Sequence, residues 1–229
     1  MVYGMEIEGN KKIYDFESVI SRKDKGSVKW QQMYQWMPDV ADDVVPLTVA
    51  DMEFKTAPEI TKGLQEYLED SILGYSVPTE GYYQAVIDWQ RRRHNFEVEK
   101  DWILTSPGVV SAFYAAVRAY TQPGEGVIIM TPVYYPFFGA IENAGRKIIR
   151  NPLLNRADDY TIDFKGLEHL CRKKENKLII FCSPHNPVGR VWTEEELARL
   201  ADIVLRYDMI IVADEIHHDL IMPGYEHKV

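Results

Sequence analysis

Short, strongly apolar runs alternate with longer segments of helical periodicity through most of this chain, and that alternation limits the possible folds more than any other feature. Several runs are apolar almost throughout, as are strands buried on both faces of a mostly parallel sheet. The pattern therefore predicts an α/β architecture. The predicted strands are residues 44–49, 102–105, 126–131, 146–150, 178–183 and 209–214.

The segments between these runs have apolar positions at helical spacing. The last begins with Thr193, and Glu196 follows three positions later, which indicates a capping box. Residues 1–50 lack sustained periodicity, so we expect an N-terminal arm or part of a smaller domain there, and a large domain over 51–229. The predicted helices are 58–72, 81–95, 110–121, 136–144, 164–174 and 193–207.

Charge and cysteine content exclude several classes of protein. The formal net charge of −9 argues against a nucleic-acid or anionic-membrane partner. No apolar run approaches the ~20 residues of a membrane span, and the first residues do not resemble a secretory signal, so we expect a cytoplasmic protein. Cys171 and Cys182 lack CxxC spacing, and we expect both to be buried, reduced thiols.

Polar residues follow two of the predicted strands, where open α/β sheets bind their ligands. Asn186, between two prolines, fits either a plain turn or a hydrogen-bonding role toward a ligand. Asp214 ends an apolar run, so its carboxylate needs a partner at low dielectric. It either caps the following turn or holds the protonated ring nitrogen of a cofactor.

Three further segments offer possible ligand-binding groups. A metal site among Asp214, Glu215, His217, His218 and Asp219 is not expected, because their spacing matches no HExxH-like motif. The amides from Gly108 to Val110 either bind a phosphate or form an ordinary Ser-Pro helix start. The aromatic residues of the 131–138 segment either stack on a planar ligand or pack in the core.

Four motifs together resemble those of the pyridoxal-phosphate (PLP) enzymes of fold type I, specifically the class I/II aminotransferases. They are Ser-Pro-Gly-Val-Val at 106–110, Thr-Pro-Val-Tyr-Tyr-Pro at 131–136, Ser-Pro-His-Asn-Pro-Val-Gly-Arg at 183–190 and Asp-Glu-Ile-His-His-Asp at 214–219. The segments 14–30 and 49–54 narrow the resemblance to the MalY/PatB branch of cystathionine β-lyases and related C–S lyases. The resemblance implies a three-layer α/β/α large domain with a mostly parallel sheet, and residues 1–50 as the arm and part of the small domain.

The resemblance also implies a role for each matching residue. Asp214 pairs with the pyridine nitrogen of PLP, while Asn186 and His217 hydrogen-bond the ring's 3-oxygen. Tyr134 stacks on the ring. The phosphate is bound by the amides of Val109 and Val110, helped by Tyr75 from a partner subunit, because the family is dimeric.

The family's catalytic lysine, which forms a Schiff base with PLP in a Ser-x-x-Lys context, is missing, since no lysine here follows a serine by three positions. We therefore expect the amino-terminal part of a C–S β-lyase that releases thiol, pyruvate and ammonia from cystathionine-like amino acids and is a homodimer at full length. The 229-residue chain alone is expected to be inactive. The alternatives are an aminotransferase of class I/II or a catalytically dead binding protein.

Overall fold

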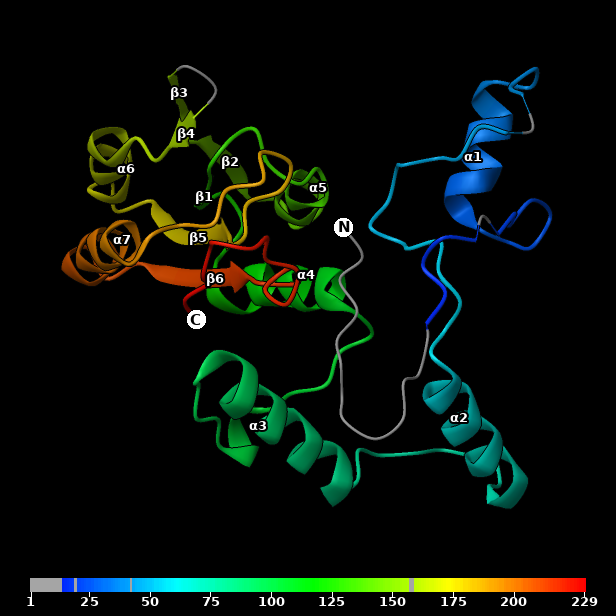
Figure 1. Cartoon of the computed structure of the whole chain (residues 1–229). Helices are drawn as coiled ribbons and strands as arrows, with labels where there is room; N and C mark the ends of the chain where they lie inside the picture. Colours follow the sequence, from blue (N-terminus) through cyan, green and yellow to red (C-terminus); the bar gives the residue numbers. More distant parts are fainter. Residues whose placement is uncertain (1–13, 19, 42, 157–158) are drawn as a thin grey trace. The chain divides into compact units, whose positions relative to one another are not determined.

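The computed structural model describes residues 14–18, 20–41, 43–156 and 159–229. The chain divides into two compact units, an N-terminal unit (Met1–Ser76) and a C-terminal unit (Val77–Val229), shown in Figure 1. The domain boundary between residues 50 and 51 stays a prediction. Residues 1–13 of the expected arm lie outside the described part of the chain.

The described part of the N-terminal unit contains helices α1 (Val28–Trp36) and α2 (Pro58–Asp70). The sequence pattern predicts α2, whose proline occupies the favourable first helical position, but it does not predict α1. Polar contacts fix α1 where a hydrophobic stripe is lacking. The buried Lys29 places Nζ 2.5 Å from Glu53 Oε1, and the Trp30 indole donates to Glu53 Oε2 at 3.2 Å.

Residues 44–49 are irregular, so the strand predicted there is wrong. Val49 has a φ of 65°, in the left-handed region that a strand cannot use. Leu47 is 94% exposed, so its side chain does not enter a core.

The C-terminal unit is built on a four-stranded parallel sheet in the order β2-β1-β5-β6. The four strands confirm four of the predicted ones. Residues 102–105 form no strand and make no ladder hydrogen bonds with a described strand; the short 3₁₀ helix η1 (Lys100–Trp102) overlaps them. The strands of the sheet are β1 (Gly126–Ile129), β2 (Lys147–Arg150), β5 (Asn176–Cys182) and β6 (Ile210–Asp214).

Helices cover both faces of this sheet, as expected for a three-layer α/β/α unit (Figure 1). Ile128 and Ile179 face a core shared with α6 and α7, whereas Val127, Ile129 and Ile180 face a second core shared with α4 and α5. Successive residues of a strand thus fill opposite cores. The helices of the C-terminal unit are α3 (Glu80–His94), α4 (Val109–Tyr120), α5 (Pro136–Glu142), α6 (Phe164–Cys171) and α7 (Glu194–Arg206).

Two local features complete the C-terminal unit. The antiparallel hairpin of β3 (Leu154–Arg156) and β4 (Asp159–Thr161) is not predicted by the sequence pattern. The capping box at α7 is confirmed, because the Thr193 hydroxyl accepts from the Glu196 amide and the Glu196 carboxylate accepts from the Thr193 amide.

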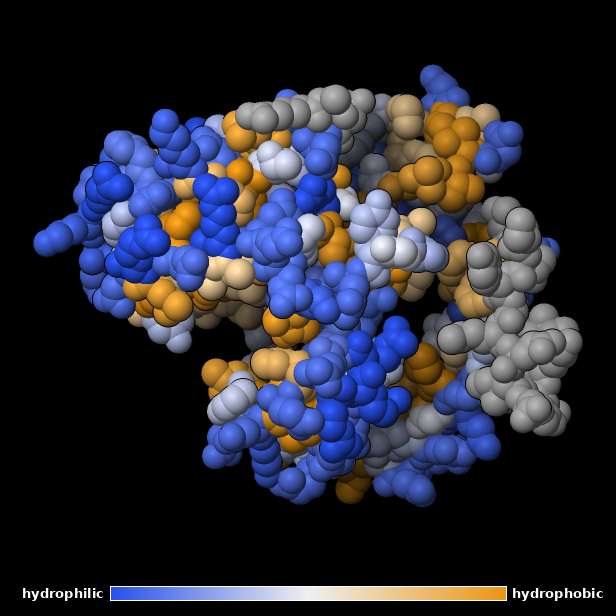
Figure 2. Space-filling model, turned by 60° about the vertical axis from the view of Figure 1, so that its left-hand side comes forward, coloured by the Kyte–Doolittle hydropathy of each residue, from blue (hydrophilic) through white to orange (hydrophobic). Residues whose placement is uncertain are grey.

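The surface in Figure 2 has mixed hydropathy, and the two cysteines are as the sequence predicts. On the face shown in Figure 2, hydrophobic patches are interspersed among hydrophilic residues. No helix in the described residues has both the length and the apolar character needed to cross a bilayer. Both cysteines are free and buried, and burial raises the pKa of each thiol to about 11.

Candidate functional site

The candidate site lies where β1, β5 and β6 end, because the carboxyl ends of parallel strands share one edge of a sheet. Cys182, the last residue of β5, is in register with Asp214, the last residue of β6. The Ser183 amide donates to the Asp214 carbonyl oxygen at 3.0 Å. The segment that carries Asn186 therefore leaves the sheet beside Asp214.

The Asp214 side chain is buried but lacks a cationic partner. The residue is 4% exposed, and its Oδ1 accepts from the Ile216 amide at 3.2 Å. Burial raises the pKa of Asp214, although the Ile216 amide and the nearby His217 oppose the shift. Within the described residues no lysine or arginine pairs with this carboxylate. Asp214 thus caps the following turn with one oxygen and still has capacity for a cationic ligand.

His217 and Asn186 are both half-buried, and His217 is one of the groups that act on the pKa of Asp214. The backbone amide nitrogen of Asn186 lies 3.4 Å from Cys182 Sγ, and this contact anchors the segment to the end of β5. Among the described residues, neither the His217 imidazole nor the Asn186 side-chain amide has a hydrogen-bond partner. Both side chains are consequently available to bind a ligand oxygen.

Tyr134 follows β1, the strand on the other side of β5. Its ring packs at 6.1 Å, edge-on, against Phe137 at the start of α5. Partial burial and the nearby Tyr135 and Asp214 raise the pKa of its hydroxyl. The Phe137 contact shows that core packing contributes to the position of Tyr134.

The amino-terminal end of α4 presents unpaired amides. Gly108, before the first helical residue, has a φ of 89°, a conformation that favours glycine. The Ser106 hydroxyl donates to the Gly108 carbonyl oxygen instead of capping the helix. Helix α4 has no side-chain cap, so the amides of Val109 and Val110 point out of the helix end, as in an anion-binding site.

Tyr75 belongs to the N-terminal unit, and its ring is fully exposed. Its role stays a prediction. The other six predicted residues, Val109, Val110, Tyr134, Asn186, Asp214 and His217, belong to the C-terminal unit. An anion-binding helix end, a buried carboxylate without a cation and an aromatic ring are the groups that a phosphorylated, protonated pyridine needs, so these residues fit PLP.

His185 is a positioning residue that the sequence pattern did not single out. It is 1% exposed, and its Nε2 donates to the Pro132 carbonyl oxygen at 2.8 Å. Burial lowers the pKa of His185 despite this bond, so the ring is neutral near pH 7. The contact joins the segments that follow β1 and β5, which hold Tyr134 and Asn186. The sequence signal that could have pointed to His185 is its position inside the Ser-Pro-His-Asn-Pro motif.

We predict that Asp214→Asn stabilises the ligand-free chain at pH 7. Because the pKa is raised on folding, the folded state holds more protons than the unfolded state above the ordinary value of 3.8, and stability falls as pH rises through that window. The variant should therefore unfold at higher urea concentration at pH 7, and its advantage should shrink as the pH approaches 4. Urea unfolding followed by circular dichroism measures this.

Asp202→Asn, at an exposed carboxylate of α7, is the matched control and should change the urea midpoint little. Lower stability of Asp214→Asn at pH 7 would show that the charged form is stabilised by its turn contacts alone.

Comparison with known proteins identifies the family. A model of the family described as aminotransferase class I and II matches residues 42–227. Cystathionine beta-lyase PatB of Bacillus subtilis is 39% identical over 93% of this chain and 54% of its own length. The chain spans about half the length of the curated relatives it matches.

Solved structures give the same result. Cystalysin from Treponema denticola, whose crystal structure contains pyridoxal 5′-phosphate, has a TM-score of 0.94 and 56% identity over 95% of this chain and 55% of its own. The PLP-bound C–S lyase from Staphylococcus hominis has a TM-score of 0.87 and 31% identity over 95% and 55%. These likenesses confirm the predicted fold and the resemblance to C–S lyases. The chain belongs to the aminotransferase class I and II family.

Proposed function

We propose that this chain forms the cofactor-binding part of a PLP-dependent C–S β-lyase that acts on cystathionine-like amino acids. The observation that carries the proposal is the buried, cation-free carboxylate of Asp214 at the same sheet edge as the unpaired His217 and Asn186 side chains. The names of the similar proteins, a cystathionine beta-lyase and a C–S lyase, support the substrate class.

PLP, when bound, supplies a protonated pyridine ring that withdraws electrons from the bonds at an amino acid's α-carbon. The buried Asp214 carboxylate would keep the ring nitrogen protonated, because the positive charge on the ring would offset the cost of burying the negative charge of Asp214. Asn186 and His217 would donate to the ring's 3-oxygen and orient the ring. Tyr134 would contact the ring, and the α4 amides would bind the phosphate.

None of these residues replaces the family's lysine, which holds and moves the substrate's α-proton. The proposed lyase reaction therefore requires residues beyond these 229, and the chain alone is expected to be inactive. A lyase and an aminotransferase share the cofactor contacts described above and differ in whether a β-leaving group departs. We favour the lyase because cystathionine beta-lyases are among the most similar relatives.

The phosphate contact is tested by Val109→Pro. Proline is tolerated at the first helical position but removes one amide donor. A hydrogen bond to a charged group contributes about 1.5–3 kcal/mol, so pyridoxine 5′-phosphate should bind this variant about tenfold more weakly or worse. Quenching of tryptophan fluorescence measures the affinity, and this probe, which lacks the aldehyde, forms no adducts with surface lysines.

Val109→Ala keeps the amide and is the matched control. Pyridoxine, which has no phosphate, should bind both variants equally. Equal loss of affinity for both probes in Val109→Pro would indicate general damage to the site and contradict the phosphate assignment.

The activity is tested on the longest natural polypeptide that contains these 229 residues. With cystathionine it should release pyruvate, ammonia and free thiol in equal amounts, measured by a coupled pyruvate assay and a thiol reagent. Keto-acid turnover that depends on glutamate, without thiol release, would contradict the lyase proposal and establish an aminotransferase.

We also propose that the full-length protein is a homodimer, as the family resemblance implies. Helix α2 buries none of its residues. Four apolar side chains at helical spacing, Ile60, Leu64, Tyr67 and Leu68, are each more than half exposed. Such a stripe on one helix is typical of a surface covered by another chain.

Leu64→Asp should convert the natural polypeptide from dimer to monomer, because a charge in an apolar interface lacks a partner. Sedimentation velocity measures this. Lys62→Ala, on the same helix but at an exposed ion pair with Glu66, should leave the dimer intact. An unchanged dimer in Leu64→Asp would place the interface elsewhere.

The free, buried cysteines support our further proposal of a cytoplasmic location, where thiols stay reduced.

A further inference from the structure

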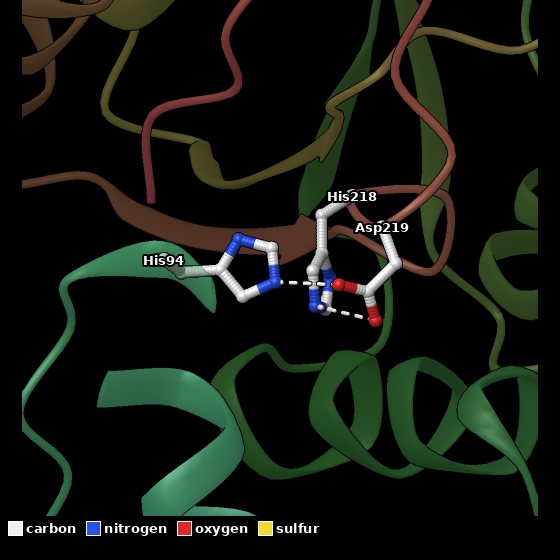
Figure 3. Close-up of side chains that lie close together, drawn as sticks. All are labelled: His94, His218 and Asp219. Carbon is white, nitrogen blue, oxygen red and sulfur yellow. Dashed lines mark hydrogen bonds and ion pairs between the residues drawn. The ribbon is translucent and has the colours of Figure 1, made fainter. Parts of the chain in front are cut away.

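A cluster of imidazole and carboxylate groups lies outside the proposed cofactor contacts, where the end of α3 meets the turn after β6 (Figure 3). His94 is the last residue of α3, while His218 and Asp219 follow β6. Their ligand atoms, two imidazole nitrogens and a carboxylate oxygen, all lie within 4.8 Å of one another. The His94 and His218 rings are edge-on, with centroids 4.2 Å apart.

A contact with Glu215 determines which ring nitrogen of His218 is free to bind a ligand. Its Nδ1 lies 2.5 Å from the Glu215 carbonyl oxygen, and a carbonyl only accepts, so Nδ1 carries the hydrogen. In the neutral ring Nε2 then bears a lone pair. This Nε2 is buried, has no hydrogen-bond partner among the described residues, and lies 3.7 Å from Asp219 Oδ2. The Nε2 lone pair and the Asp219 carboxylate would repel each other, and a cation between them would bind both.

Asp219 is held by neighbours of the kind that support a metal ligand. The Trp89 indole nitrogen lies 3.0 Å from Oδ2 and 3.2 Å from Oδ1, and His94 Nε2 lies 2.8 Å from Oδ1. Hydrogen bonds to a carboxylate and to the far nitrogen of a histidine fix ligand orientation in metal sites. Asp219 has such a hydrogen bond from Trp89, and His218 has one from its Nδ1 to the Glu215 carbonyl oxygen.

We propose that His94, His218 and Asp219 bind a divalent transition-metal cation, with zinc as the representative occupant. Zinc takes imidazole nitrogens and carboxylate oxygens at about 2.0–2.2 Å, which puts neighbouring donors in a tetrahedral site about 3.3 Å apart. His94 Nε2 lies 2.8 Å from Asp219 Oδ1, and His218 Nε2 lies 3.7 Å from the other oxygen, Oδ2. The three ligand atoms lie within 4.8 Å of one another, so the donors have to draw together when the metal binds. On metal binding the proton of His94 Nε2 is exchanged through solvent to Nδ1, so that Nε2 gives up its hydrogen bond to Asp219 and offers its lone pair to the metal. Water fills the fourth position.

The site ties the end of α3 to the turn that follows β6. It uses none of the residues assigned to PLP, so its test is independent of the proposed function. The sequence pattern after β6 does not predict it, because His94, which completes the set, lies 125 positions from Asp219.

The test is a titration of the 229-residue chain, first stripped of metal with EDTA, with ZnCl₂ by isothermal titration calorimetry. One zinc ion should bind per chain, and Co²⁺ in its place should give a visible absorption band of tetrahedral coordination. Zinc should raise the midpoint of thermal unfolding, because it binds the folded state. His218→Gln should weaken zinc binding about tenfold or more, since one of three protein ligands is lost.

His169→Gln, at an exposed histidine of α6, is the matched control and should bind zinc like the parent chain. The side chain of His218 is 20% exposed, so its variant should fold, which circular dichroism checks; Asp219→Asn is a second variant with the same expectation. Absence of zinc binding, or binding that is equal in the parent and in both ligand variants, would overturn the proposal.

Discussion

The central strand β5 is the constraint on which the rest of the C-terminal unit depends. It is hydrogen-bonded to β1 on one side and β6 on the other, and all but one of its residues are buried. A strand in this position needs apolar side chains toward both faces, which explains the apolar run from Leu178 to Cys182. Its parallel register with β6 also places Cys182 opposite Asp214, so the packing of the core determines where the polar residues of the site emerge.

Two groups at this edge lack a full set of partners among the described residues. Helix α4 begins without a side-chain cap, as α1, α2 and α5 also do. Lys29 in the N-terminal unit is buried with a carboxylate partner, whereas Asp214 is buried without a cation. Such local conflicts cost stability and are expected where a ligand completes the structure. Both occur at the strand-end side of the same sheet, which is the physical case for one ligand with an anionic and a cationic end.

The sequence could predict those parts of the structure that depend on local periodicity. Strands β1, β2, β5 and β6 and the helices of the C-terminal unit have clear patterns, and the motif resemblance proposed the site residues, six of which lie in this unit. Helix α1 could not be predicted, since Lys29 and Trp30 are fixed by Glu53, more than twenty positions away. Residues 44–49 have a strand-like pattern, but the backbone turns at Val49. The link from His185 to Pro132 likewise depends on two strands being neighbours.

The turn after β6 is shared by the two proposed sites. Asp214 Oδ1 accepts from the Ile216 amide, and the Glu215 carbonyl oxygen accepts from both the His218 amide and His218 Nδ1. These bonds fix the backbone on both sides of His217, which is assigned to the cofactor, while His218 and Asp219 face His94 and Trp89 of α3. A cation that joins His94, His218 and Asp219 would therefore restrict the same short segment that orients His217. Because the restraint acts through the backbone, the cation would add no group to the proposed cofactor contacts. Its effect would be on how rigidly His217 is held.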